Sequence, residues 1–136
     1  MKDNKILCWY GNDPFEAGKT LMTASDVWKN WALSDHIGLK PNLVVSKKAS
    51  SGATTHPEFC AGIISFLQEK GFQKISILEG SWVGDRTQKA FEVCGFTDIS
   101  QKYSTPLVDL QLDKSVLRKG SHGEYRICRS ILELDR

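Results

Sequence analysis

Residues 55–81 read THPEFCAGIISFLQEKGFQKISILEGS, and this stretch decides the predicted fold because a helix and a strand follow each other within it. Thr55-His56-Pro57-Glu58 matches a capping box with proline in the first turn, where its missing N–H costs nothing. The apolar residues that follow form one helical stripe: Phe59, Cys60, Ile63, Phe66 and Leu67. The stretch therefore predicts a helix over residues 55–70.

A glycine ends this helix and starts the connection to a strand. Gly71 suits a helix end, and Phe72 can fold back on the last turn as in a Schellman motif. Residues 74–79 then read as a short apolar strand. The same unit follows again, because Asp85 is expected to cap a helix that stops at Gly95 and residues 107–110 form a further short strand.

The segments before this stretch add two more predicted strands. Residues 6–10 are a continuous apolar run and read as a buried strand, and residues 15–32 favour a helix in two pieces. Residues 36–45 read as a strand whose regular pairing stops near Lys40, because Pro41 cannot donate to a ladder. Residues 46–54 are a polar loop. Residues 124–134 fit neither the helical nor the strand period.

Alternating strands and helices with short glycine-ended connections predict an α/β fold. We expect a mainly parallel sheet of about four to five strands with helices on both faces, a Rossmann-like three-layer arrangement. The length of 136 residues fits one domain over residues 1–136.

Composition excludes several classes of protein. Eighteen basic and 16 acidic residues give a net charge of +2, which is too even to indicate nucleic acid or an anionic membrane as partner. No apolar stretch approaches the roughly 20 residues of a membrane helix, and the charged start is unlike a signal peptide. We therefore expect a cytoplasmic protein. The four cysteines form no CxxC pair, so neither a zinc knuckle nor an iron–sulfur cluster is predicted in this chain.

Polar residues gather where the predicted strands end, which is where ligands bind in parallel sheets. Lys40 and Asn42 follow one strand, and Thr55 and His56 begin the helix whose unpaired amides can attract an anion. Lys47 and Lys48 add positive charge nearby. A structural interpretation stays open, in which Thr55 caps the helix, His56 lies in its first turn and the lysines only solvate the loop.

A second group of polar residues follows the strand over residues 74–79. Glu79 ends this strand and Ser81 follows one glycine later. A carboxylate in this position suits a metal ligand or a general base, although no catalytic residue is assigned. The predicted binding residues, all at the rim of the sheet, are Lys40, Asn42, Thr55, His56, Glu79 and Ser81.

Three segments carry a resemblance to a known family. IGLKPNLV (37–44), ATTHPE (53–58) and ILEGS (77–81) resemble the uncharacterised family catalogued as domain of unknown function 362. The resemblance implies that Lys40, Asn42, Thr55, His56 and Glu79 occupy motif positions. It also implies a longer protein, of which this chain is the N-terminal part. Some relatives carry an iron–sulfur segment, but its cysteines are missing here, so a cluster is expected only in a segment or partner outside this chain.

Three hypotheses follow for the function. In the first, the chain is the small-anion or substrate-binding part of an enzyme-like protein. In the second, it is a non-catalytic interaction module that docks a redox or partner domain through Trp28, Trp31 and Trp82. In the third, it is a fragment that leaves apolar surface bare for a missing downstream domain, and it self-associates as a homo-oligomer.

Overall fold

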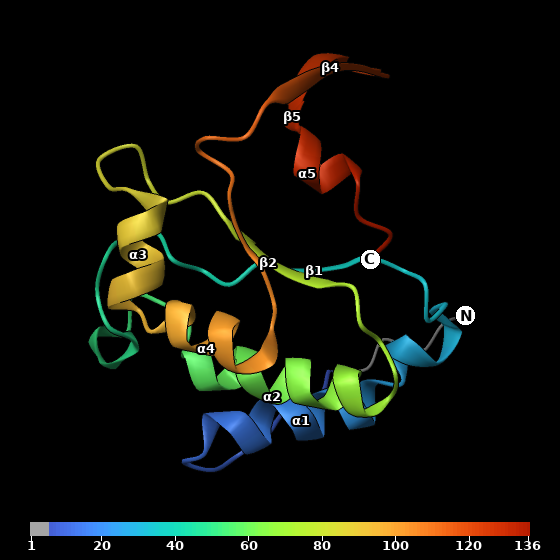
Figure 1. Ribbon diagram of the computed structural model, residues 1–136, viewed down its shortest axis with the longest axis vertical. Coiled ribbons are helices and arrows are strands. Elements are labelled where there is room, and N and C mark those ends of the chain that lie inside the picture. Colours follow the sequence, from blue (N-terminus) through green and yellow to red (C-terminus); the bar gives the residue numbers. More distant parts are fainter. Residues whose placement is uncertain (1–5) are drawn as a thin grey trace.

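The computed structural model describes residues 6–136 and shows a mixed α/β protein (Figure 1). A parallel sheet in the order β1-β2-β3 lies at its centre. Its strands are β1 (Ile37–Leu39), β2 (Ile75–Glu79) and β3 (Leu107–Asp109). A separate antiparallel hairpin consists of β4 (Ser115–Gly120) and β5 (Gly123–Cys128). The residues described thus contain three parallel strands, fewer than the four to five that the sequence predicts.

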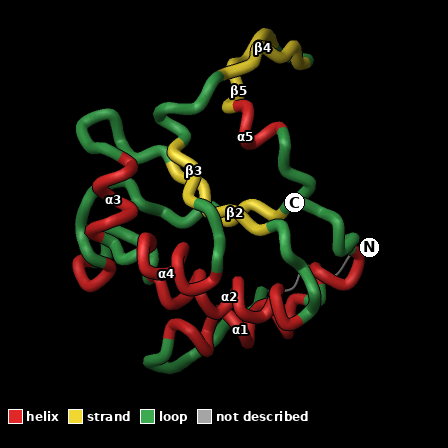
Figure 2. Tube along the Cα trace, in the orientation of Figure 1, coloured by secondary structure: helices red, strands yellow, loops and turns green. Residues whose placement is uncertain are grey.

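The three longest helices and the hairpin lie on opposite sides of the parallel sheet (Figure 2). On one side lie α1 (Pro14–Ser25), α2 (Pro57–Glu69) and α4 (Phe96–Tyr103), and α3 (Thr87–Val93) lies at the end of the sheet. The other side holds α5 (Arg129–Leu132) and the hairpin. Two 3₁₀ turns complete the elements, η1 (Val27–Asn30) and η2 (Ala49–Ser51).

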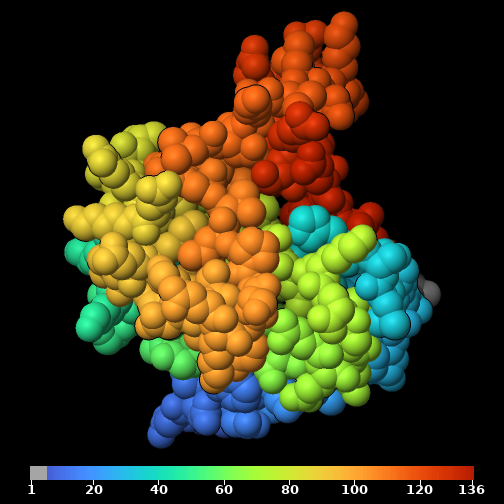
Figure 3. All heavy atoms as spheres, in the orientation of Figure 1, coloured from blue at the N-terminus to red at the C-terminus, as the bar shows by residue number. Residues whose placement is uncertain are grey.

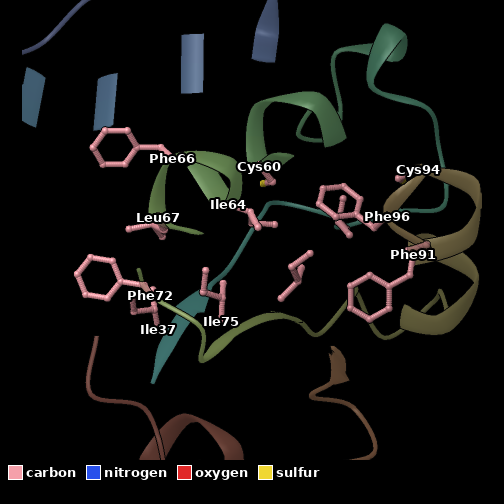
Figure 4. Packing of buried hydrophobic residues seen from close by; sticks show 13 residues of the cluster. Ile37, Cys60, Ile64, Phe66, Leu67, Phe72, Ile75, Phe91, Cys94 and Phe96 are labelled. Atoms are coloured by element: carbon pink, nitrogen blue, oxygen red, sulfur yellow. The ribbon is translucent and has the colours of Figure 1, made fainter. Parts of the chain in front are cut away.

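The core forms between the sheet and α2 (Figure 4). Ile37, Ile75 and Ile77 point from the strands toward Ile64 and Leu67 of α2, and each of the five is at most 3% exposed. Phe91 and Phe96 extend this cluster toward α3 and α4. The predicted helical stripe therefore packs largely as expected, because residues spaced three and four apart share one face.

Two glycines let α1 and α2 touch through their backbones. A Cβ on Gly62 would collide with the Phe15 carbonyl, and a Cβ on Gly18 would collide with the Phe59 carbonyl. The predicted helix end is also confirmed, since Gly71 adopts a φ of +95° and the Phe72 N–H donates to the Leu67 carbonyl at 3.0 Å.

The prediction of a buried strand over residues 6–10 is wrong. These residues form no regular structure, and Ile6 and Tyr10 are 89% and 92% exposed. An apolar run indicates a strand only where a sheet edge lies next to it. The turn at Asp13 instead leads directly into α1, because the Asp13 carboxylate accepts from the Phe15 and Glu16 amides.

Several other boundaries differ from the prediction. The strand expected over residues 36–45 is regular only over β1, and its pairing does stop before Lys40. Residues 124–134 fit no single period because β5 passes directly into α5. The last residues return to the parallel sheet: the Gly38 N–H donates to the Arg136 carbonyl at 2.8 Å, and the Arg136 N–H donates to the His36 carbonyl at 3.2 Å.

Candidate functional site

Glu79 is a buried carboxylate at the carboxyl end of β2, and its side chain is 4% exposed. The Lys40 ammonium donates to its two oxygens at 2.9 and 3.0 Å. Two backbone amides complete the set, those of Gly80 at 2.8 Å and Leu43 at 3.2 Å. A buried charge needs such donors to offset its lost hydration. Glu79 therefore holds the segment after β1 against the end of β2.

Asn42 and Thr55 join the two ends of the loop between them. The Asn42 N–H donates to the Thr55 hydroxyl and the Thr55 N–H donates to the Asn42 carbonyl, both at 2.9 Å. The predicted capping role of Thr55 is therefore wrong, because its hydroxyl faces Asn42 rather than the first turn of α2. His56 occupies the N-cap position without a side-chain hydrogen bond, and Pro57 begins the helix as expected.

Ser81 is a buried residue on the same rim. Its hydroxyl donates to the Leu43 carbonyl at 2.7 Å, and its N–H donates to the Thr87 hydroxyl at 3.0 Å. Gln111, which the sequence does not single out, bonds to the same loop: its amide nitrogen donates to the Ser81 carbonyl at 2.9 Å and its oxygen accepts from the Thr87 N–H. Only the folded chain brings Gln111 to this position.

Asp85 closes the other end of the rim. Its carboxylate accepts from the Ser46 hydroxyl and the Ser46 N–H, both at 2.6 Å, and from the Arg86 N–H at 2.8 Å. Hydrogen bonds from Ser46 lower the pKa of Asp85 to about 2. The prediction that Asp85 caps a helix is wrong, because α3 begins at Thr87 and its first amide bonds to Gln111.

Two surface pockets flank the start of α2. The larger, the α2 pocket, has a volume of about 320 Å³ and is lined by Lys48, Ala49, Ser50, His56, Pro57, Glu58, Val93, Cys94 and Gly95. The smaller, the Cys60 pocket, measures about 200 Å³ and is lined by Leu39, Lys40, Pro41, Thr55, Phe59, Cys60 and Ile63. Burial raises the pKa of the Cys60 thiol to about 12, which keeps it protonated at neutral pH.

The structure brings five of the six predicted rim residues into one region and separates the sixth. Lys40 pairs with Glu79, Asn42 pairs with Thr55, and Ser81 bonds to the segment between them. His56 instead lines the α2 pocket, where its Nδ1 lies 3.8 Å from the Glu58 carboxylate. Lys48 and Ser50 share this pocket with His56.

The tryptophans of the predicted docking surface do not form one surface. Trp28 packs edge-on against Phe66 with ring centroids 5.3 Å apart, and Trp31 packs likewise against Phe72 at 6.0 Å. Both extend the core. Trp82 is 62% exposed, so it alone of the three presents most of its surface to solvent.

Within residues 6–136, neither a metal centre nor a membrane-spanning helix is found. No group of three or more His, Cys, Asp and Glu side chains there is arranged to hold a metal ion. No helix in the same residues has both the length and the apolar character needed to cross a membrane.

A three-stranded parallel sheet with polar side chains at its carboxyl ends defines the class of the protein as mixed α/β. Residues 37–136 match the family described as Domain of unknown function (DUF362), and the chain belongs to that family. The match includes all six rim residues. No curated protein and no solved structure matches the chain significantly.

Proposed function

We propose that this chain is the small-anion-binding part of an enzyme-like protein and that the anion occupies the α2 pocket. Phosphate or a carboxylate group of a substrate has the appropriate chemistry. Lys48, Ser50 and His56 line the pocket beside the positive end of a 13-residue helix.

The observation that carries the proposal is the missing side-chain cap of α2. Helix starts normally use a side-chain oxygen to accept from a first-turn amide. Here the Thr55 hydroxyl accepts from Asn42 instead, and His56 makes no capping bond. Among the residues described, no oxygen accepts from the Glu58 N–H, the first amide after Pro57. An anion oxygen would supply this acceptor.

The other rim residues have a positioning role in this proposal. The Lys40 ammonium is balanced by Glu79, so it provides little free charge for a ligand. Its ion pair fixes the segment after β1, and the Asn42–Thr55 pair fixes His56, which follows directly in the chain. The Glu58 carboxylate opposes an anion, because it also lines the pocket.

Calorimetry with inorganic phosphate tests the proposal. Lys48→Ala should weaken binding by about tenfold to a hundredfold, since a charge-assisted hydrogen bond contributes roughly 1.5–3 kcal/mol. Lys47→Ala is the matched control, because it removes the same charge from the neighbouring residue, which does not line the pocket. Glu58→Gln should strengthen binding. Equal losses for the two lysine variants, or no heat for the unaltered chain, would contradict the proposal.

The rival role as an interaction module keeps less support. It needs a surface of tryptophans, and two of the three pack against the core. Trp82 remains as its single exposed anchor. Trp82→Ala in a pull-down with a redox partner domain would test this role separately from phosphate binding.

A further inference from the structure

The β4–β5 hairpin stands out from the rest of the molecule (Figure 3). Within residues 6–136 its strands pair only with each other, so each has an outer edge without a partner strand there. Residues 123–126 of β5 are all exposed. An isolated two-stranded hairpin is only marginally stable in water, and an unpaired strand edge is a template for another strand. The hairpin therefore presents two candidate docking edges.

The hydrogen-bond pattern shows which backbone groups of β5 face outward. The Arg129 N–H donates to the Lys114 carbonyl at 2.7 Å, so this pair faces inward between the strands. Inward and outward residues alternate in an antiparallel ladder. Arg118 pairs with Tyr125 in this register, so the backbone N–H and C=O groups of Tyr125 point toward β4. The same groups of Glu124 and Arg126 point outward. The outer edge of β5 thus offers the backbone of Glu124 and Arg126.

Charge distinguishes the two edges. β4 carries Arg118 and Lys119 in succession and no acidic residue, and lysine and arginine on an edge strand discourage pairing. β5 carries one acidic and one basic residue, Glu124 and Arg126, on either side of Tyr125. Two β5 strands that run antiparallel and are centred on Tyr125 would therefore place opposite charges against each other.

We propose that a second copy of this chain pairs antiparallel with the first along the outer edge of β5, with the two-fold axis at Tyr125. Each Glu124 then lies opposite Arg126 of the other copy, and the two Tyr125 residues lie opposite each other. Two hairpins become one four-stranded sheet. The antiparallel direction leaves the two molecular bodies at opposite ends of that sheet.

The backbone pattern and charge together select this register. Only outward-facing residues can exchange hydrogen bonds. Among the exposed side-chain-bearing residues of β5, the axis can lie at Glu124, Tyr125 or Arg126. An axis at Glu124 would oppose two carboxylates, and an axis at Arg126 would oppose two guanidinium groups. Like charges directly opposite destabilise a sheet, and opposite charges stabilise it. The axis at Tyr125 alone gives two opposite-charge pairs and an aromatic pair.

Sedimentation equilibrium on charge variants tests the pairing. The apparent mass of the unaltered chain should rise toward twice the monomer mass as the protein concentration approaches about 1 mM. Such a small edge contact is expected to give only a weak dimer. Arg126→Glu leaves two acidic side chains on the edge, and Glu124→Arg leaves two basic ones. Each variant alone should associate about tenfold more weakly. An equimolar mixture should restore association, since only the mixed pair has opposite charges.

Cysteine cross-linking supplies a second measurement, because a disulfide traps even a weakly populated dimer. Opposed residues in a non-hydrogen-bonded pair have Cα atoms about 4.5 Å apart, within disulfide range. In a background with Cys8→Ser and Cys128→Ser, Tyr125→Cys should form an intermolecular disulfide under mild oxidation. Leu117→Cys is the matched control, because Leu117 and Tyr125 are equally exposed at 48% but Leu117 lies on β4.

A monomer at every concentration, or a mixture that fails to associate, would overturn the proposal. Equal cross-linking of both cysteine variants would also overturn it. Binding of a single-stranded oligonucleotide to a persistent monomer, abolished by Arg118→Glu, would assign the hairpin to a polyanion instead. Phosphate binding in the α2 pocket is independent of these outcomes.

Discussion

The Lys40 ammonium lies 2.9 and 3.0 Å from the two carboxylate oxygens of Glu79, although Lys40 is 60% exposed and Glu79 only 4%. One partner is thus in water and the other in the protein interior. Two amides also donate to Glu79, so the ion pair closes a complete shell around the carboxylate. This relationship makes Lys40 part of the framework of the rim rather than a free cation.

Removing Lys40 should therefore destabilise the fold. Lys40→Ala leaves the buried Glu79 carboxylate with only its amide donors, and an unsatisfied buried acceptor costs about 1–3 kcal/mol. Urea unfolding of the variant and the unaltered chain measures the difference. Lys19→Ala is the control, because Lys19 pairs with Glu69 on the exposed surface at 2.7 Å. A larger loss for Lys19→Ala than for Lys40→Ala would contradict this role.

Asp85 should give the fold a specific dependence on acid pH. Its pKa falls from an ordinary 3.8 to about 2 in the folded chain, mainly through hydrogen bonds from Ser46. A carboxylate whose pKa is lowered on folding stabilises the fold at every pH above its unfolded-state pKa. This contribution disappears as the pH falls from about 4 to 2. Asp85→Asn should therefore unfold more readily than the unaltered chain at pH 6. The gap between their unfolding midpoints should narrow by pH 2, and a constant gap would refute the assignment.

The cysteines should differ in reactivity. Cys8 is exposed, whereas Cys60 is buried and its pKa is raised to about 12. Only thiolates attack disulfide reagents, so Cys8 should be labelled rapidly at pH 8 and Cys60 only after unfolding. Peptide mass spectrometry after timed labelling distinguishes the two. Rapid labelling of Cys60 in the folded chain would contradict the burial of its thiol.

Gly62→Ala should separate α1 from α2. The added Cβ collides with the backbone carbonyl of Phe15, which cannot move without shifting the helix. Overpacking of this kind costs about 1–3 kcal/mol. Ser65→Ala on the same helix is the comparison, since it removes a hydroxyl without adding volume. Thermal unfolding should rank Gly62→Ala as the less stable variant; the opposite order would exclude the close helix contact.

The sequence predicts well the elements whose signals are local. α2, the turn at Gly71 and β2 follow from spacing, a glycine and a short apolar run, and all three are found. Residues 6–10 have the same apolar character as β2 but no adjacent strand. Whether a strand lies beside an apolar run depends on distant parts of the chain, which the run itself does not reveal. The β4–β5 hairpin was missed because both of its faces are exposed, so its residues do not alternate between polar and apolar.

The position of the rim residues was predictable but their bonding was not, and of the six predicted binding residues only His56 lines the α2 pocket. Lys40, Asn42, Glu79 and Ser81 were placed at the rim by the rule for parallel strands, and they lie there. Which of them are already paired depends on contacts between distant segments. The Thr55 hydroxyl bonds to the Asn42 N–H and therefore leaves the first-turn amides of α2 without a side-chain cap. No spacing in the sequence indicates this change of partner.

Amide chemical shifts during a phosphate titration test the central claim most directly. We predict that the Glu58 N–H shifts most, together with the amides of Ser50 and His56, and that Lys48→Ala abolishes these shifts while Lys47→Ala preserves them. Shifts that centre on another part of the chain, or none at phosphate concentrations of about 10 mM, far above ordinary ligand dissociation constants, would contradict the anion site at α2.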